Sequence, residues 1–326
     1  MTGASETPQA PATRGGAAAA TTMAGPFLVS KLRTLDDRLQ GAAPRVLASS
    51  SDENAVHDLR VALRRTRTVL EVGRGVLGRF HADEVRRSLR EVHRTSGGLR
   101  DEEVFLELFA KLGVDDPGVG PWLDTRRARE RHLRRALIKS LESGKLDGGR
   151  RMLAALLTFP VKPSRDKRLG KLARRAVDKA RRDVLRLRAA PMDDPEALHR
   201  LRIAYKRLRY VVETFAEALT PELAALAQPA ARFQSRLGDL HDVDVAMVAV
   251  KRARALSEGA RGHLVAALER VRVERMAAYA REIGLVNIAP APPVKAAPPP
   301  VSKLSSEANG SIHVAAPPRG RRIASR

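Results

Sequence analysis

One stretch of this chain occurs twice. The segment HDLRVALRRTR, which begins at His57, returns as HRLRIAYKRLR at His199, a shift of 142 residues, and every basic position of the first copy stays basic. A second pair of segments, GGLRDEEV and GDLHDVDV, is separated by nearly the same distance and begins at Gly97 and Gly238. Two anchors at almost one offset predict a chain built by internal duplication.

The sequence around these segments has the periodicity of helices. Apolar residues recur every three or four positions, as in VHDLRVALRRTRTVLEV and LVAALERVRVERMAAYA, which is typical of amphipathic helices. Helix starts are marked by side chains that can cap a helix, at Asp52, Asp116, Asp194 and Thr220. We therefore expect an all-α fold of two tandem pseudo-symmetric four-helix bundles, with about eight long helices.

Composition divides the chain into a folded centre and two tails. Both ends are rich in Ala, Pro, Gly and Ser, and runs such as APAPPVKAAPPP cannot sustain a helix or a strand. We expect a disordered tail over 1–24, a folded domain over 25–286 made of two repeats, 25–158 and 164–286, and a disordered basic tail over 287–326.

The charge balance points to a polyanionic partner. There are 60 Lys and Arg against 37 Asp and Glu, a formal net charge of +23. Only 1 Trp, 3 Tyr and 7 Phe are present, which is few for stacking on unpaired bases. The absence of cysteine excludes disulfides and thiolate metal sites and suits a reducing cytoplasm. Charged residues interrupt every apolar stretch, so we expect neither a membrane span nor a secretory signal.

The repeated basic segment forms a stripe on each of two predicted helices. Positions 57, 60, 64 and 67 fall within an arc of roughly 80° on an ideal helix. Val56, Leu59, Leu63 and Leu70 form an apolar face beside them. Aligned cations repel one another, and no acidic residue shares the stripe with them, so the pattern indicates an anionic ligand such as phosphate. The principal candidates for binding it are His57, Arg60, Arg64, Arg67, His199, Arg202, Lys206 and Arg209.

These motifs resemble those of the CHAD family, the conserved histidine α-helical domain, over about residues 25–286. The resemblance implies two pseudo-symmetric bundles around a basic central pocket, binding of inorganic polyphosphate, and a place at polyphosphate granules in the cytoplasm. It also implies a binding module and no catalysis. Further basic candidates come from the first helix of each unit and from positions beside the stripe. They are Lys31, Arg33, Arg65, Lys171, Arg175 and Arg207.

Other interpretations remain at this point. Asp101 and Asp242 are expected to orient arginines by accepting their hydrogen bonds. His57-Asp58 and His241-Asp242 could suggest a metal-dependent phosphohydrolase of the His-Asp type. Arg200 replaces Asp58 in the second copy, however, and the surrounding arginines would repel a divalent cation. We therefore predict no enzyme activity, no metal and no cofactor. The main alternative is a nucleic-acid-binding, nucleoid-associated protein, because the same cations would attract nucleic acids or acidic proteins non-specifically.

Overall fold

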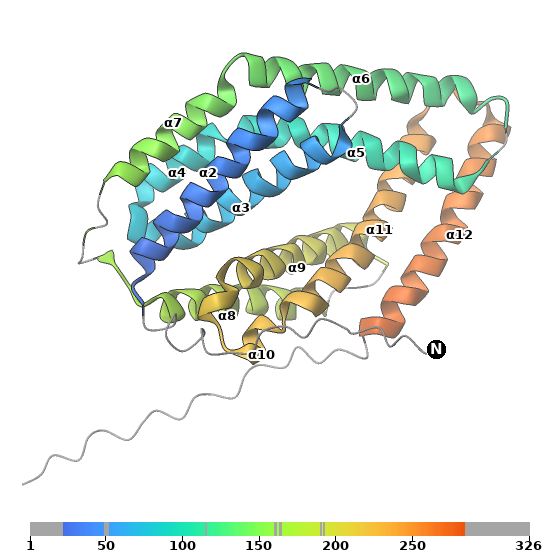
Figure 1. Ribbon diagram of the computed structural model, residues 1–326. Helices are drawn as coiled ribbons and strands as arrows, with labels where there is room; N and C mark the ends of the chain where they lie inside the picture. Colours follow the sequence, from blue (N-terminus) through green and yellow to red (C-terminus); the bar gives the residue numbers. More distant parts are fainter. Residues whose placement is uncertain are drawn as a thin grey trace, which may run out of the picture. The chain divides into compact units, whose positions relative to one another are not determined.

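A computed structural model describes residues 22–48, 52–114, 116–159, 162, 165–189, 191 and 193–283 (Figure 1). Within this part of the chain all regular elements are helices, apart from one bridge between Met23 and Arg168, so the expected all-α class is confirmed. The helices are α2 (Ala24–Ala48), α3 (Glu53–Leu77), α4 (Arg79–Ser88), α5 (Arg90–Leu112), α6 (Gly120–Glu142), α7 (Lys145–Thr158), α8 (Leu169–Leu187), α9 (Pro195–Phe215), η2 (Ala216–Ala218), α10 (Pro221–Ala224), α11 (Ala227–Arg252) and α12 (Glu258–Ile283).

The helices that carry the repeated basic segment begin where capping side chains predict. The Asp52 carboxylate accepts a hydrogen bond from the backbone N–H of Ala55 at the start of α3. Asp194 accepts from two backbone N–H groups at the start of α9, where Pro195 needs no partner for its nitrogen. Asp116 does not start a helix: its side chain accepts from the N–H of Gly118 within a turn, and α6 begins at Gly120.

The described part of residues 25–158 contains six helices where four were expected. Two breaks account for the difference. Leu89 separates α4 from α5 but keeps helical dihedral angles, and Gly144 separates α6 from α7 in the left-handed region at φ 71°. Helices α4 and α5 together therefore occupy the place of one predicted helix, and α6 and α7 together occupy the place of another. Residues 164–286 contain four long helices, α8, α9, α11 and α12, besides the short η2 and α10.

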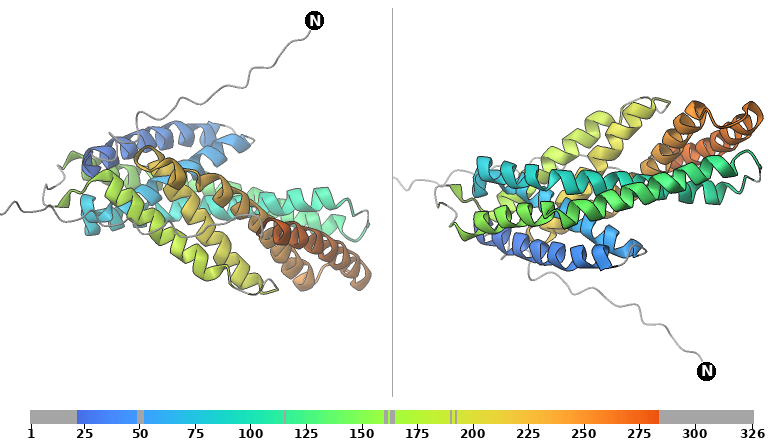
Figure 2. Two further views of the ribbon diagram at one scale, coloured as in Figure 1. Left: turned by 90° about the horizontal axis from the view of Figure 1, so that it is seen from below. Right: turned by 90° about the horizontal axis from the view of Figure 1, so that it is seen from above.

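Matching helices of the two halves pack alike. In the first half α2 packs on α3 and α5 on α6, and in the second α8 packs on α9 and α11 on α12. In Figures 1 and 2, α6 lies beside α5, and α12 lies beside α11. The halves meet where α3 contacts α9 and where α5 contacts α11. A second apolar core, containing Phe105, Trp122, Val243 and Leu264, draws on helices of both halves.

The contact between α3 and α9 is reciprocal. Arg65 on α3 donates to Glu213 on α9 at 3.5 Å, and Arg207 on α9 donates to Glu71 on α3. Arg207 stands 142 residues after Arg65, and Glu213 stands 142 residues after Glu71. Equivalent positions of the repeated segment thus exchange equivalent ion pairs. This is the pattern of an isologous interface, formed here within a single chain.

The two predicted tails fall almost wholly outside the described residues. Residues 22–24 are the exception, and they differ from the expectation of disorder. The N–H of Ala24 donates to the carbonyl of Lys167 at 2.7 Å, and the N–H of Leu169 donates to the carbonyl of Thr22 at 2.7 Å. These backbone bonds hold the start of α2 against the start of α8. The chain over 287–326 lies beyond the described residues.

Candidate functional site

A cavity of about 540 Å³ lies where α3, α5, α9 and α11 come together. Most of its lining occurs as matched pairs at the offsets of the sequence repeat. The matched pairs are His57 with His199, Arg60 with Arg202, Val61 with Ile203, Arg64 with Lys206, His93 with Gln234, Arg100 with His241, Asp101 with Asp242 and Val104 with Val245. Gly97 and Phe105 complete the lining.

The amphipathic pattern of α3 and α9 determines which side chains reach this cavity. The predicted apolar face of α3, including Leu59 and Leu63, is fully buried in the main core, and so are Tyr205 and Leu208 of α9. Burying that face leaves the basic stripe of each helix at the edge of the packed structure. Both stripes therefore border one cavity. A single ligand in this cavity could contact both halves of the chain.

Two glycines of the second repeated motif make room for arginines. A Cβ atom on Gly97 of α5 would lie 3.4 Å from Nη1 of Arg60. A Cβ atom on Gly238 of α11 would lie 3.4 Å from Nε of Arg202. The same contact thus occurs once in each half. A larger side chain at either position would compete with the guanidinium for its place.

Several arginines at the cavity have buried donors without a protein acceptor. Among the described residues, these are Nη1 of Arg60, Nε of Arg64 and Nε of Arg202. Unpaired buried donors are costly, and the cost falls when an anion is placed beside them. Arg64 is held in position from its other side, because Nη1 donates to the Tyr210 hydroxyl and the guanidinium lies 5.1 Å from the centre of the Tyr210 ring.

Burial and nearby positive charge together depress the pKa values of Lys206 and His93 at the cavity. Burial, followed by repulsion from Arg64 and Arg202, lowers the pKa of the Lys206 ammonium to about 7. Burial and the surrounding cations, Arg67 first among them, lower the pKa of His93 to about 3. The site thus carries positive charge that its own residues do not neutralise.

The second half also contains a close pair of histidines. Nδ1 of His199 on α9 lies 3.2 Å from Nδ1 of His241 on α11, and the ring centres are 4.2 Å apart. Burial, then repulsion from His199, lowers the pKa of His241 to about 4. Burial, then repulsion from Arg202, also lowers the pKa of His199. Both rings are therefore neutral at neutral pH while the cavity is empty of anions.

The two aspartates of the second motif line the cavity without direct arginine contacts. Neither Asp101 nor Asp242 accepts a hydrogen bond from an arginine among the described residues, in contrast to the expectation that they orient those side chains. Their influence is electrostatic: burial, then repulsion from Arg64, lowers the pKa of Arg60, and the negative charge of Asp101 opposes this shift. Burial raises the pKa of Asp242 to about 6, although Arg202 opposes the shift.

Two of the eight principal candidates lie outside the cavity. Arg67 is one turn beyond Arg64, where its charge is close to those of Arg86 and Arg90. Arg209 donates to Glu213 at 2.6 Å on its own helix. The other six candidates line the cavity, three from each half.

The further basic candidates also lie elsewhere. Arg65 and Arg207 form the reciprocal ion pairs between α3 and α9. Lys31 pairs with Glu217 at 3.0 Å. No residue of α2 or α8 lines the cavity. The three remaining candidates on these helices are exposed to solvent, and they are Arg33, Lys171 and Arg175.

Four polar residues of the lining were not among the predicted binding residues. They are His93, Arg100, Gln234 and His241. His93 and Gln234 lie outside both repeated motifs, and only the offset of 141 residues between α5 and α11 relates them. Arg100 and His241 are related by the same offset and adjoin the two aspartates, so applying the offset to the whole of the second motif would have found them.

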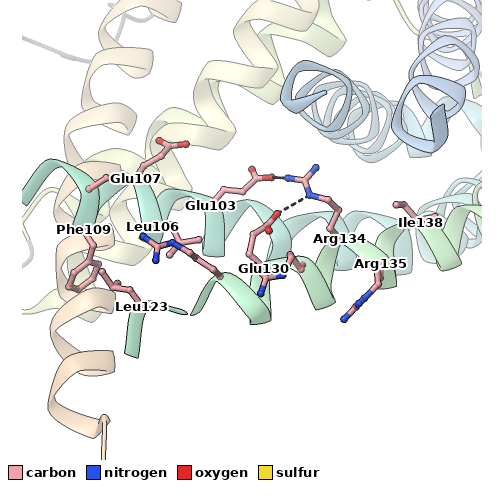
Figure 3. A pocket seen from close by; sticks show the side chains of 12 residues that line it. Glu103, Leu106, Glu107, Phe109, Leu123, Glu130, Arg134, Arg135 and Ile138 are labelled. Atoms are coloured by element: carbon pink, nitrogen blue, oxygen red, sulfur yellow. Dashed lines mark hydrogen bonds and ion pairs between the residues drawn. The ribbon is translucent and has the colours of Figure 1, made fainter. Parts of the chain in front are cut away.

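A larger groove of about 810 Å³ lies between α5 and α6 (Figure 3). Its floor is apolar, and its central arginine already has partners: Arg134 donates to Glu103 at 2.9 Å and to Glu130 at 2.8 Å. Arg131 and Arg135 at its rim are exposed to solvent. The groove comes from one half of the chain only and lacks the matched cations of the cavity, which is therefore the stronger candidate site.

No group of three or more His, Asp or Glu side chains in the described ranges is arranged to hold a metal ion. None of the described helices is long and apolar enough to cross a membrane.

Comparison with known proteins identifies the family. The model of the CHAD domain matches residues 32–251, more than half of the chain, so the protein belongs to the CHAD domain family. Its fold is similar to that of a CHAD domain from the plant Ricinus communis, with a TM-score of 0.64 and 20% identity over 82% of this chain and 94% of that one. It is also similar to PptA from Streptomyces chartreusis, with a TM-score of 0.60 and 18% identity over 80% of this chain and 99% of that one. No curated protein matches.

Proposed function

We propose that the cavity binds inorganic polyphosphate between two pseudo-symmetric repeats, 25–158 and 164–286, without catalysis and at polyphosphate granules in the cytoplasm. The observation that carries this proposal is the set of matched cations from both halves around one cavity. Arg60 and Arg202 occupy equivalent places there, and each retains a buried donor without a protein partner. A chain of phosphoryl groups supplies acceptors for such donors along its whole length.

The dimensions and burial of the site favour a slender polyanion over duplex nucleic acid. A cavity of about 540 Å³ is in the size range of small-ligand sites. Its central cations, Arg64 and Lys206, are partly buried between helices. A flexible phosphate chain can enter such a space, whereas the backbone of a rigid duplex stays at the surface.

The decisive experiment exchanges cavity cations for carboxylates. We expect the double variant Arg64→Glu, Lys206→Glu to lose at least about 100-fold in polyphosphate affinity, because two charge-assisted contacts worth roughly 1.5–3 kcal/mol each are removed. The melting temperature should not fall, because the new carboxylates relieve the repulsion on Arg60 and Arg202. Affinity is measured by titration calorimetry at fixed salt, since polyanion binding depends strongly on ionic strength.

The matched control is Arg131→Glu, Arg135→Glu, which makes two charge reversals at exposed positions of α6 outside the cavity. This variant should bind polyphosphate nearly as the unchanged protein does. Duplex DNA serves as the competing ligand. Tighter binding of DNA than of polyphosphate at the same salt concentration, or equal losses in the two variants, would refute the proposal.

A further inference from the structure

The two halves of the cavity differ in chemistry at one matched position. Arg100 of α5 donates to Glu103 at 3.2 Å and to Glu107 at 2.9 Å. The equivalent residue of α11 is His241, whose contact is with another base, His199, at 3.2 Å. One half thus holds a permanent cation there, and the other holds a pair of titratable rings.

The carboxylates that neutralise Arg100 have no equivalent beside His241. The position that corresponds to Glu107 is Val248. The position that corresponds to Glu103 is Asp244, and this carboxylate accepts from Arg272 of α12 at 2.7 Å. Among the described residues, a proton on His241 therefore has no carboxylate as a hydrogen-bond partner.

The charged groups that face the histidine pair come from all four helices of the cavity. Arg202 and Lys206 of α9 oppose protonation, and Glu196 of α9 favours it at His199. Asp242 of α11 lines the same cavity, as do three residues of α3 and three of α5. These six are His57, Arg60, Arg64, His93, Arg100 and Asp101. Cations outnumber carboxylates in this set, so protonation of the pair needs an additional anion.

The geometry of the pair limits how it can be protonated. Two Nδ1 atoms 3.2 Å apart form a hydrogen bond only while one of them lacks a proton. When both rings are protonated, both Nδ1 atoms are donors, so they can no longer bond to each other and each needs another acceptor. A phosphoryl group has several acceptor oxygens and a negative charge, so it can satisfy both donors at once.

We propose that His199 and His241 form a proton-dependent phosphate subsite of the cavity. With no anion bound, the rings are neutral and contact each other. When a phosphoryl group binds, the two rings take up protons from solvent, separate, and donate to its oxygens, while Arg202 provides the permanent charge beside them. The inference rests on the proposed function and adds that binding in this half of the cavity consumes protons, whereas Arg100 in the other half needs none.

The test counts protons. Calorimetric titration with polyphosphate at pH 6, in several buffers that differ in ionisation enthalpy, gives the number of protons taken up per bound chain. At this pH the His241 ring starts almost fully neutral and Lys206 is already mostly protonated. Burial and Arg202 lower the pKa of His199, so its ring is less protonated than an ordinary histidine. We expect uptake of about one to two protons, and a loss of about one in His241→Gln and in His199→Gln. The control His132→Gln changes an exposed histidine on α6 and should leave the uptake unchanged.

A gain-of-charge variant separates the inference from the proposed function. His241→Arg installs the residue that the first half has, so polyphosphate should bind with less proton uptake at pH 6 and with higher affinity than the unchanged protein at pH 8. The proton-dependent subsite is refuted if polyphosphate binds tightly but the histidine variants take up as many protons as the unchanged protein. Failure of polyphosphate to bind at all would instead refute the proposed function.

Discussion

Gly238 allows the contribution of Arg202 to be measured without touching any charged residue. The Gly238→Ala change places a Cβ atom 3.4 Å from Nε and 3.9 Å from Nη2 of Arg202, which is close to ordinary contact distance. Replacing glycine inside a helix by alanine stabilises it by about 0.5–1 kcal/mol. We therefore expect a small rise in melting temperature, of about 2 °C, and little change in affinity.

Gly238→Leu should separate stability from binding. Leucine is nearly as favourable as alanine in a helix, but its atoms beyond Cβ need the space that the Arg202 guanidinium occupies. Displacing one charge-assisted contact of about 1.5–3 kcal/mol lowers polyphosphate affinity about 10- to 100-fold. Thermal unfolding and calorimetric titration of the same samples give both quantities.

The control for this series is Gly148 of α7, whose Cβ atom would meet no atom within 4 Å. Gly148→Leu should give the same gain in helix stability with unchanged affinity. A Gly238→Leu variant that folds and binds polyphosphate as tightly as the unchanged protein would contradict the placement of Arg202 in the binding site.

Two further predictions concern Lys206 and the reciprocal ion pairs. Because the pKa of Lys206 is about 7 without an anion and a bound polyanion raises it, polyphosphate affinity should fall as pH rises from about 7 until the pKa of the bound state is passed. Lys206→Arg should flatten this part of a calorimetric pH series, and an unchanged slope would exclude Lys206 as its source. Glu71→Gln with Glu213→Gln removes both ion pairs between α3 and α9, together with the pairs that Glu71 forms with Arg86 and Glu213 with Arg209, and all these side chains are partly exposed. Urea unfolding should show a loss of about 0.2–1 kcal/mol for each pair, and a loss several times larger would mean that these pairs hold the two halves together.

The sequence was most informative where one pattern occurred twice. The repeated segment predicted α3 and α9, their buried faces, and six cavity residues, because a helical stripe and its apolar neighbours depend only on local spacing. Arg67 and Arg209 belong to the same stripes but lie outside the cavity. Two helices in contact bring only a limited length of each stripe to one cavity, and that length depends on how they cross, which local spacing does not encode.

Other features depended on tertiary packing. The interruptions at Leu89 and Gly144 do not disturb the apolar periodicity. The sequence therefore predicted two continuous helices where the structure has four, α4 to α7. His93 and Gln234 lack any local motif and become part of the site only because α5 packs against α11. Lys171 and Arg175 are exposed on α8 and contribute nothing to the lining, because α8 packs on α9 and no residue of α8 reaches the cavity.

The position of the cavity at the junction of the halves links ligand supply to mechanical integrity. Like charges from α3 and α9 face one another across this junction, so without a bound anion these charges repel one another at the place where the halves meet. A polyanion held there would act as a non-covalent crosslink, adding about 2.7 kcal/mol to the free energy of unfolding when its concentration is 100 times Kd. Abundance of the anion would then determine how long each molecule survives, as well as whether it is occupied.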